Sequence, residues 1–258
     1  MALAERTGEH DDHVVTENSG GRGRFVILCD HASNKIPPSF AGLGLNAAER
    51  VTHIAWDPGA LAVSRRLAER LDAPLLWPDV SRLVIDCNRA HDAPDLIAET
   101  GEGREIPGNR DLAADERRAR IERFHDPYHQ AVDACLDARL AAGRDCALVA
   151  VHSFTPVFRG IERPWPVGII FNRDRGLADH VIDGLKAEEA LNVGVNEPYT
   201  PADRVYTTLS RHGEARGLPA VMIEIRNDEI AAAAGQTAWA DRLADILVQA
   251  PLEGRADA

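Results

Sequence analysis

"RFVILCDHASNKIP", residues 24–37, carries the chain from an apolar run to a cluster of polar side chains within a few positions. The β-branched and aromatic residues at 25–29 predict a buried strand. Asp30 and His31 follow this run directly, and two prolines end the stretch. In an open parallel sheet, ligands bind in the crevice at the carboxyl ends of the strands. This stretch therefore predicts a ligand site at the edge of such a sheet.

The rest of the chain alternates short apolar runs with longer segments of helical period, which predicts an α/β fold with a mostly parallel central sheet and helices on its faces. Strands are expected at residues 25–29, 75–77, 83–87, 147–151, 167–171 and 220–225. Helices are expected at residues 57–73, 112–142 with an interruption at Pro127, 177–191, 207–216 and 236–248.

Length and composition indicate one domain. A chain of 258 residues with 45% hydrophobic residues can bury a sizeable core. We expect a flexible polar leader over residues 1–22 and a single α/β domain over residues 23–258. Two long polar segments, 90–111 and 154–166, are expected to be functional or disordered loops, since structureless loops of this length are uncommon in compact domains.

The net charge of −12 argues against nonspecific binding to nucleic acids or to anionic membranes. A small anionic substrate would therefore need arginines placed locally at its site. No secretory signal or membrane-spanning run is visible in the sequence. The four cysteines are scattered without a CxxC pair, which favours reduced thiols and a cytoplasmic location.

Polar residues follow or end several of the predicted strands, and these positions would share one edge of a parallel sheet. They are Asp30 and His31, Asn88 and Arg89, His152 and Ser153, Asn172 and Arg173, and Glu224 with Arg226. If the strands before His31 and His152 are neighbours, two imidazoles and a carboxylate could form an open zinc site with room for water.

Three other patterns offer competing interpretations. His125 and His129 lie four apart and could share a helix face, but without an HExxH motif we interpret them as a surface or pocket-edge pair. Cys29 or Cys87 could act as a nucleophile, although cysteines that end apolar strands are usually inert. Asp57, followed by Pro58, is a good N-cap residue for the helix expected after it.

The ordered motifs CDHASNKIP, HIAWDPGA, SRLVIDCNR, PGN, VHSFTPVFRG, RPWPVGIIF, NEPY and IEIRND closely resemble the N-formylglutamate amidohydrolase family. The resemblance extends from about Phe25 to Trp239. It implies a zinc-dependent amide hydrolase with a three-layer αβα fold similar to zinc carboxypeptidases and aspartoacylase. It also implies His31 and His152 as zinc ligands and Glu224 as the general base.

The third zinc ligand is left open by the resemblance. The related carboxypeptidase pattern has a glutamate three residues after its first histidine, where this chain has Asn34. An amide oxygen is a poor zinc ligand beside a carboxylate. Asp57 is therefore our candidate, with Asn34 as the alternative and the N-cap role as the competing interpretation of Asp57.

The resemblance further implies that Asn88 and Arg89 hold a substrate carboxylate. Arg163 or Arg226 would assist through paired hydrogen bonds. The alternative for Arg89 is a structural ion pair with an acidic residue of the loop that follows it.

These residues predict a Zn2+-dependent enzyme that cleaves N-formyl-L-glutamate to formate and L-glutamate, a step of histidine degradation. One alternative is hydrolysis of another N-acyl amino acid, and another is a noncatalytic protein that binds acidic amino acids. A small anionic substrate is the expected partner, and a homo-oligomer is possible.

Overall fold

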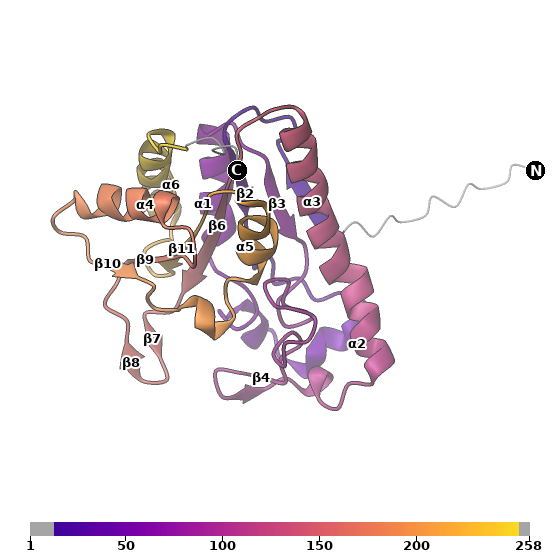
Figure 1. Ribbon diagram of the computed structural model, residues 1–258. Coiled ribbons are helices and arrows are strands. Elements are labelled where there is room, and N and C mark those ends of the chain that lie inside the picture. The colour runs from indigo at the N-terminus through magenta and orange to yellow at the C-terminus, as the bar shows by residue number, and fades with distance from the viewer. Residues whose placement is uncertain (1–12, 253–258) are drawn as a thin grey trace, which may run out of the picture.

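The computed structural model describes residues 13–252, in which a seven-stranded sheet lies between two layers of helices (Figure 1). Its strands are β1 (Val14–Glu17), β2 (Phe25–Leu28), β3 (Leu75–Pro78), β6 (Ala147–Phe154), β9 (Val167–Ile170), β10 (Val193–Val195) and β11 (Ala220–Arg226). The helices are α1 (Ala60–Arg70), α2 (Ala114–Arg120), α3 (Asp126–Ala141), α4 (Gly176–Lys186), α5 (Thr207–His212) and α6 (Ala233–Val248). The predicted α/β fold class is confirmed.

The sheet is mostly parallel, as predicted, with the strand order β1-β3-β2-β6-β11-β9-β10. Strands β3, β2, β6 and β11 run parallel, whereas β1 is antiparallel to β3, and β9 is antiparallel to β11. The reversal of β9 places its carboxyl end at the opposite edge from those of β2, β6 and β11. The expectation that Asn172 and Arg173 share the polar edge is therefore wrong, and both residues instead donate hydrogen bonds to Glu214.

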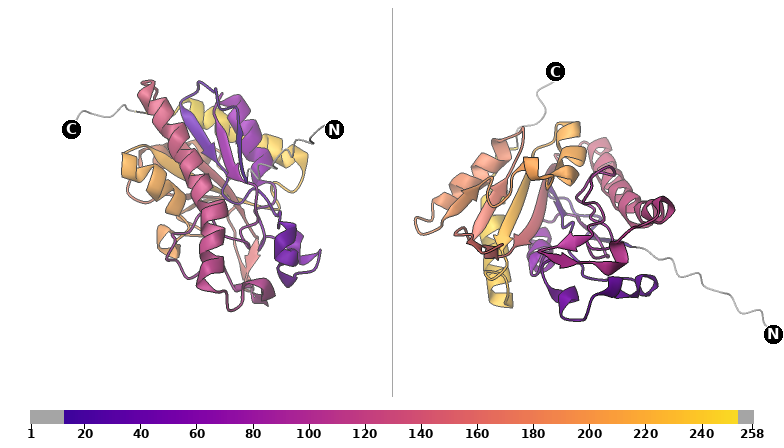
Figure 2. Two further views of the ribbon diagram at one scale, coloured as in Figure 1. Left: turned by 90° about the vertical axis from the view of Figure 1, so that its right-hand side faces the viewer. Right: turned by 90° about the horizontal axis from the view of Figure 1, so that it is seen from below.

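Alternating side chains of the central strands fill two apolar cores. Phe25 and Ile27 of β2 face the layer of α1, α4 and α6, and Val26 and Leu28 face α3 and α5. The two helical layers are seen on opposite sides of the sheet in Figure 2. Burial on both faces explains why these strands are continuous apolar runs.

The predicted strand at residues 83–87 is absent, because this buried segment forms turns. Leu83, Val84 and Ile85 pack in a third apolar cluster with Leu96 and Phe124. The run is apolar because loops and α2–α3 cover it, so its burial does not indicate pairing with another strand.

The predicted flexible leader is wrong for Val14–Glu17, which pair with β3 as edge strand β1. Val14 and Val15 pack against the two apolar cores on opposite faces of the sheet, and this burial explains why the segment is ordered. Residues 1–12 of the expected leader lie outside the described residues.

The interruption expected at Pro127 is a π-helical turn, Ile121–His125, between α2 and α3. Pro127 has no backbone N–H to donate to the preceding turn, so a regular α-helix cannot continue through it. The remaining predicted helices are present with shifted ends. A separate 3₁₀ turn, Glu214–Arg216, completes the segment predicted after Thr207.

The two long loops carry small hairpins that project at one end of the molecule (Figure 1). The first contains β4 (Thr100–Gly101) and β5 (Arg104–Glu105), and the second contains β7 (Val157–Phe158) and β8 (Ile161–Glu162). Both hairpins contribute to the walls of one pocket through Gly101 and Phe158.

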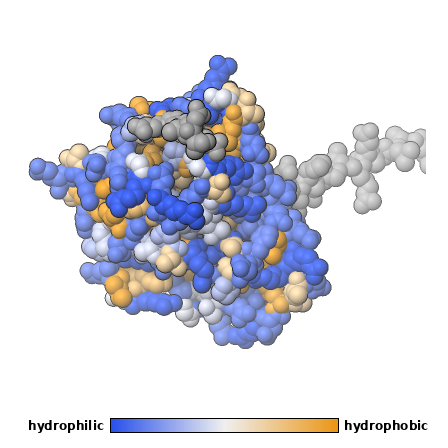
Figure 3. Space-filling view, in the orientation of Figure 1, coloured by the Kyte–Doolittle hydropathy of each residue, from blue (hydrophilic) through white to orange (hydrophobic). Residues whose placement is uncertain are grey.

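The surface in the orientation of Figure 1 is mainly hydrophilic, with small scattered apolar patches (Figure 3). Among the described residues, no helix combines the length and the apolar character needed to cross a membrane.

Candidate active site

Neighbouring parallel strands bring His31 and His152 together, as their positions in the sequence predict. Strand β2 pairs with β6, and His31 lies just beyond the end of β2. His152 lies inside β6, which is longer than predicted and ends at Phe154. The two Nδ1 atoms are 3.2 Å apart.

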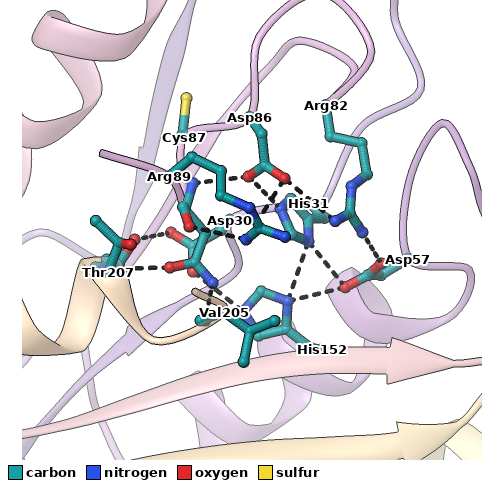
Figure 4. A network of polar contacts seen from close by, with 12 residues as sticks. Asp30, His31, Asp57, Arg82, Asp86, Cys87, Arg89, His152, Val205 and Thr207 are labelled. Atoms are coloured by element: carbon teal, nitrogen blue, oxygen red, sulfur yellow. Dashed lines mark hydrogen bonds and ion pairs between the residues drawn. The ribbon is translucent and has the colours of Figure 1, made fainter. Parts of the chain in front are cut away.

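Asp57 completes this cluster from the loop before α1 (Figure 4). Its Oδ2 atom lies 2.9 Å from His152 Nδ1 and 3.3 Å from His31 Nδ1. All three side chains are buried. The structure thus places two imidazole nitrogens and one carboxylate oxygen around a single point.

The other ring nitrogen of each histidine, Nε2, contacts a further carboxylate, and the two carboxylates belong to different residues. His31 Nε2 lies 2.8 Å from Asp86 Oδ1, and His152 Nε2 lies 3.1 Å from Asp30 Oδ2. When each Nε2–H donates to its carboxylate, each Nδ1 presents a lone pair to the centre of the cluster. Such outer carboxylates orient histidine ligands and make them more basic.

The donor set fits a zinc ion. With metal–nitrogen distances near 2.0–2.1 Å, tetrahedral ligands stand about 3.3 Å apart. The three separations here are 3.2, 2.9 and 3.3 Å. Two histidines and a carboxylate also leave a fourth position for water or substrate, as in catalytic zinc sites.

The electrostatics of the cluster call for positive charge. Burial alone would lower the pKa of His152, but hydrogen bonds with Asp30 and Asp57 raise this pKa well above its usual range. Burial would raise the pKa of Asp57, but the charge of His31 and hydrogen bonds from both histidines bring it well below the usual range. A proton or a metal ion can supply the charge that this site favours.

The interpretation of Asp57 as a helix cap is wrong. Helix α1 begins at Ala60, its N-cap is Gly59 in the left-handed region at φ 83°, and no side chain caps it. Asp57 contributes only its backbone carbonyl, which accepts a hydrogen bond from the Ala60 N–H at 3.2 Å. The carboxylate of Asp57 does not cap the helix and instead contacts His31 and His152.

Asn34, the alternative third ligand, points elsewhere. Its Nδ2 donates to the backbone oxygen of Arg50 at 3.1 Å, and Asn34 does not line the pocket that contains His31. Of the two candidates, Asp57 is the residue that the structure places beside both histidines.

Arg82 is a site residue that sequence reasoning missed. Its guanidinium contacts Asp57 Oδ1 at 3.4 Å and Asp86 Oδ2 at 3.2 Å. Burial would raise the pKa of Asp86, but His31, Arg89 and Arg82 hold it well below the usual range. The four-residue spacing of Arg82 and Asp86 was the available signal, and the mistaken strand at 83–87 obscured it.

The sequence places Asp30 at the sheet edge but does not identify it as the partner of His152. Tyr128 Oη and Thr208 Oγ1 donate to Asp30 Oδ1 at 2.8 and 2.9 Å. Burial would raise the pKa of Asp30, but the hydrogen bond from His152 and the charges of His152 and His31 lower it. The residues that hold Asp30 come from α3 and α5, and no local motif marks them.

Glu224 stands beside His152 as its partner on the neighbouring strand β11. This residue is 4% exposed, and within the described residues its Oε2 has no hydrogen-bond partner. Burial raises the pKa of this carboxyl group. An unpaired, buried carboxylate oxygen beside a ligand cluster is suited to exchange protons with a small molecule bound there.

The ligand cluster and Glu224 line one pocket of about 250 Å³. The charged residues, histidines and tyrosine that line it are His31, His53, Asp57, Arg82, Asp86, Arg89, Asp95, Glu102, His152, Tyr199 and Glu224. The two lining arginines are the local positive groups that an anionic ligand would require in this acidic protein.

Asn88 and Arg89 line the pocket, yet both are held by the protein. Asn88 Nδ2 donates to the backbone oxygen of Val205, and Asn88 Oδ1 accepts from the Thr208 N–H at 3.0 Å. Arg89 Nε contacts Asp95 Oδ2 at 2.9 Å, which is the loop ion pair considered as its alternative role. Substrate binding by these two residues stays a prediction.

Arg163 and Arg226 are not among the residues that line this pocket. Arg163 stacks on Phe158 and Tyr199, which form part of the wall, with its guanidinium 4.6 and 4.8 Å from the ring centroids. Arg226 pairs with Asp228 and Glu229 at 2.7 and 3.2 Å. The structure therefore brings neither guanidinium into the cluster formed by His31 and His152.

The competing patterns lie outside the pocket. His125 and His129 are buried, so their interpretation as a surface or pocket-edge pair is wrong. Their Nε2 atoms each lie 2.9 Å from a main-chain oxygen, of Arg89 and Cys87 respectively, because this helix face packs inward. Burial raises the pKa values of the Cys29 and Cys87 thiols, which disfavours a thiolate nucleophile.

Comparison with known proteins agrees with this geometry. A family model described as N-formylglutamate amidohydrolase matches residues 23–231. A solved gene product of Agrobacterium tumefaciens is 42% identical, with a TM-score of 0.90, covering 92% of this chain and 94% of the other. No curated protein matches the chain significantly.

A solved N-formylglutamate amidohydrolase from Ralstonia eutropha is 22% identical, with a TM-score of 0.68, and the alignment covers 92% of this chain and 96% of the other. At this identity the likeness shows a shared fold. The family model, by contrast, spans most of the described residues and contains the whole ligand cluster. The chain therefore belongs to the N-formylglutamate amidohydrolase family.

Proposed function

We propose that this protein is a zinc-dependent amidohydrolase that cleaves N-formyl-L-glutamate to formate and L-glutamate. The observation that carries the proposal is the convergence of His31 Nδ1, His152 Nδ1 and Asp57 Oδ2 beside the unpaired carboxylate of Glu224. Family membership supports the choice of amide substrate.

A bound Zn2+ would supply a Lewis acid that polarises the formyl oxygen and makes water acidic enough to attack near neutral pH. His31, His152 and Asp57 would hold the ion. Asp86 and Asp30 would keep the two imidazoles in the tautomer that presents Nδ1.

Glu224 is the proposed general base and acid. Its carboxylate would take a proton from the attacking water and return it to the departing nitrogen of glutamate as the C–N bond breaks. The raised pKa of this buried group brings it nearer to the operating pH, where such transfers are efficient.

Arg82 and Arg89 are the proposed partners of the substrate carboxylates, because their guanidinium groups line the pocket. A guanidinium can grip a carboxylate through two parallel hydrogen bonds. Arg163 and Arg226 would act from outside the pocket, Arg163 by supporting the wall at Phe158 and Tyr199.

The test is hydrolysis by the purified chain after metal removal and after return of Zn2+. Formate and glutamate should appear in equal amounts with zinc, and only at background level without it. Full turnover by the metal-free chain would overturn the zinc-dependent mechanism.

Hydrolysis of another N-acyl amino acid is the second candidate. It is favoured by the pairing of both pocket arginines with carboxylates of the protein, Arg82 with Asp57 and Asp86, and Arg89 with Asp95. A panel of N-formyl and N-acetyl amino acids separates the two candidates. The proposal expects the highest kcat/KM for N-formylglutamate, consistent with a role in histidine degradation.

A further inference from the structure

A second cluster of metal-binding side chains lies outside the pocket, where the loop after Arg89 meets the junction of α2 and α3. His91 Nε2 is 3.0 Å from His125 Nδ1 and 2.9 Å from Asp126 Oδ1. His125 Nδ1 is 3.5 Å from the same carboxylate oxygen. None of these three residues lines the active-site pocket.

The separations match those of the active-site cluster. Tetrahedral zinc ligands stand about 3.3 Å apart, and the values here are 3.0, 2.9 and 3.5 Å. The chemical types are also the same, two imidazole nitrogens and one carboxylate oxygen.

The protein holds His125 in the state that a metal requires. Its Nε2 lies 2.9 Å from the backbone oxygen of Arg89 and can only donate there, so Nδ1 carries a lone pair toward His91. This carbonyl contact is the usual outer partner of a metal-bound histidine.

The hydrogen bonds within the cluster are incomplete without a cation. His91 Nε2 faces two acceptors, His125 Nδ1 and Asp126 Oδ1, but has at most one proton to donate to them. A divalent ion would satisfy all three atoms at once.

The backbone around the cluster is positioned by other contacts. Arg117 Nη2 donates to the backbone oxygens of His91 and Ala93 at 2.9 and 3.1 Å, which ties the loop to α2. On the helical side, the π-helical turn Ile121–His125 sets the direction of His125, and such turns often occur at functional sites.

We propose that His91, His125 and Asp126 form a second metal site for a divalent ion of the zinc class. His91 is exposed and His125 is buried, so the ion would be held on the protein side and completed by water on the solvent side. Imidazole ligands select this class over Mg2+ and Ca2+, which prefer oxygen.

Such an ion would stabilise the part of the active-site wall that contains Arg89. It would connect His91 to His125, whose ring already contacts the backbone of Arg89, and the Arg89 guanidinium lines the pocket. The site would thus stabilise the loop that carries Arg89 without touching substrate.

The site is tested by calorimetric titration of Zn2+ into the metal-free chain. His91→Ala should lower the stoichiometry by one equivalent relative to wild type, whatever number the active site contributes. In a His31→Ala/His152→Ala background, one equivalent should still bind, and adding His91→Ala should remove it.

Asp126→Asn, which keeps the shape of the side chain but removes its charge, should weaken this event by at least about 10-fold, the scale on which even outer partners of a metal matter. The matched control for His91→Ala is His180→Ala, because His180 Nε2 contacts Ile246 O on another part of the fold. It should leave the stoichiometry unchanged.

Equal zinc stoichiometry in wild type and His91→Ala, with both chains folded by circular dichroism, would overturn the proposal. Loss of zinc binding in the His31→Ala/His152→Ala chain, with no further effect of His91→Ala, would do the same. Hydrolase activity is not the readout, so failure of the proposed reaction is distinguishable from failure of this site.

Discussion

His152 Nδ1 lies 2.9 Å from Asp57 Oδ2, a contact between residues 95 positions apart in the chain. Strand β6 supplies the imidazole and the loop before α1 supplies the carboxylate. Because this carboxylate leaves the helix uncapped and turns to the histidines, Asp57 is the decisive residue for the metal site proposed at His31 and His152.

Replacement of Asp57 by alanine should abolish tight zinc binding at the active site and hydrolysis together, so the zinc content should fall by one equivalent. The change removes one of three proposed ligands, so zinc affinity should fall by more than the roughly 10–100-fold typical of outer partners. Asn34→Ala is the control, since Asn34 contacts Arg50 instead. Zinc content per chain after gel filtration measures the effect, and normal zinc content in Asp57→Ala would assign the third ligand elsewhere.

The outer carboxylates should tune zinc affinity without being ligands. Asp86→Asn keeps the shape of the side chain but weakens the contact to His31 Nε2. We expect zinc affinity to fall about 10–100-fold. Competition with a chelator measures this loss. An unchanged affinity in a folded Asp86→Asn chain would contradict the orienting role.

Glu224→Gln should retain zinc and lose turnover. The amide cannot accept a proton from water, and general acid–base catalysis contributes about 100- to 10,000-fold. Glu102→Gln is the matched control, because Glu102 also lines the pocket but is exposed and pairs with His53. If both variants kept near-normal kcat, the base would have to be another carboxylate, with Asp57 or Asp30 next.

Arg89→Lys should lower kcat/KM for N-formylglutamate by roughly tenfold or more, because an ammonium cannot reproduce two parallel hydrogen bonds, each worth about 1.5–3 kcal/mol when charged. Arg89→Ala should lower it further.

Asp95→Asn separates this role from a structural one. It weakens the ion pair with Arg89 and leaves the guanidinium in place. If Arg89 only supports the loop, Arg89→Lys and Asp95→Asn should lower the Tm alike and leave kcat/KM unchanged. That result would end the assignment of Arg89 to the substrate carboxylate.

Stability should fall as the pH drops below about 6.5, the ordinary pKa of histidine. Burial lowers the pKa of His129 to about 2 and that of His212 to about 4. Both rings stay neutral in the folded chain and become protonated in the unfolded chain, so their stabilising contribution is complete above pH 6.5 and is lost as the pH falls. Each contributes up to about 1.4 kcal/mol per pH unit to the slope.

Urea unfolding between pH 6.5 and 5 measures this slope. His212→Gln should be less stable at pH 7, because it disturbs the contacts of His212 with His129 and Asp133, but its stability should fall less steeply with pH. His180→Gln is the control for replacing a histidine, because His180 contacts Ile246 O on another part of the fold. A slope in His212→Gln equal to that of wild type would rule out this source of acid sensitivity.

Local sequence patterns determined much of the sheet and one end of the site. The side chains of β2, β3, β6, β9 and β11 are buried, mostly on both faces of the sheet. Strands buried in this way need continuous apolar runs, and such runs can be recognised in the sequence. His31 could be placed because it follows a strand directly. The interruption near Pro127 could be placed because proline chemistry is local.

Tertiary structure decided what depends on contacts between distant segments. Residues 83–87 are as apolar as a strand but are covered by loops, since burial does not specify a hydrogen-bonding partner. The reversed direction of β9 follows from its pairing with β11, and it removes Asn172 and Arg173 from the site. Strand direction leaves no mark in the apolar pattern, so the sequence could not reveal it.

The site also combines features that local sequence predicts with contacts that only the tertiary structure decides. Asp57 has the local context of a helix cap, and only the approach of β6 shows that its carboxylate faces His152. The contact of Arg82 with Asp57 and that of Asp30 with His152 could not be predicted, because the partners come from other segments. The sequence by itself determined which residue types were available at the sheet edge, whereas long-range packing decided which of their atoms converge, because only packing sets distances between residues far apart in the chain.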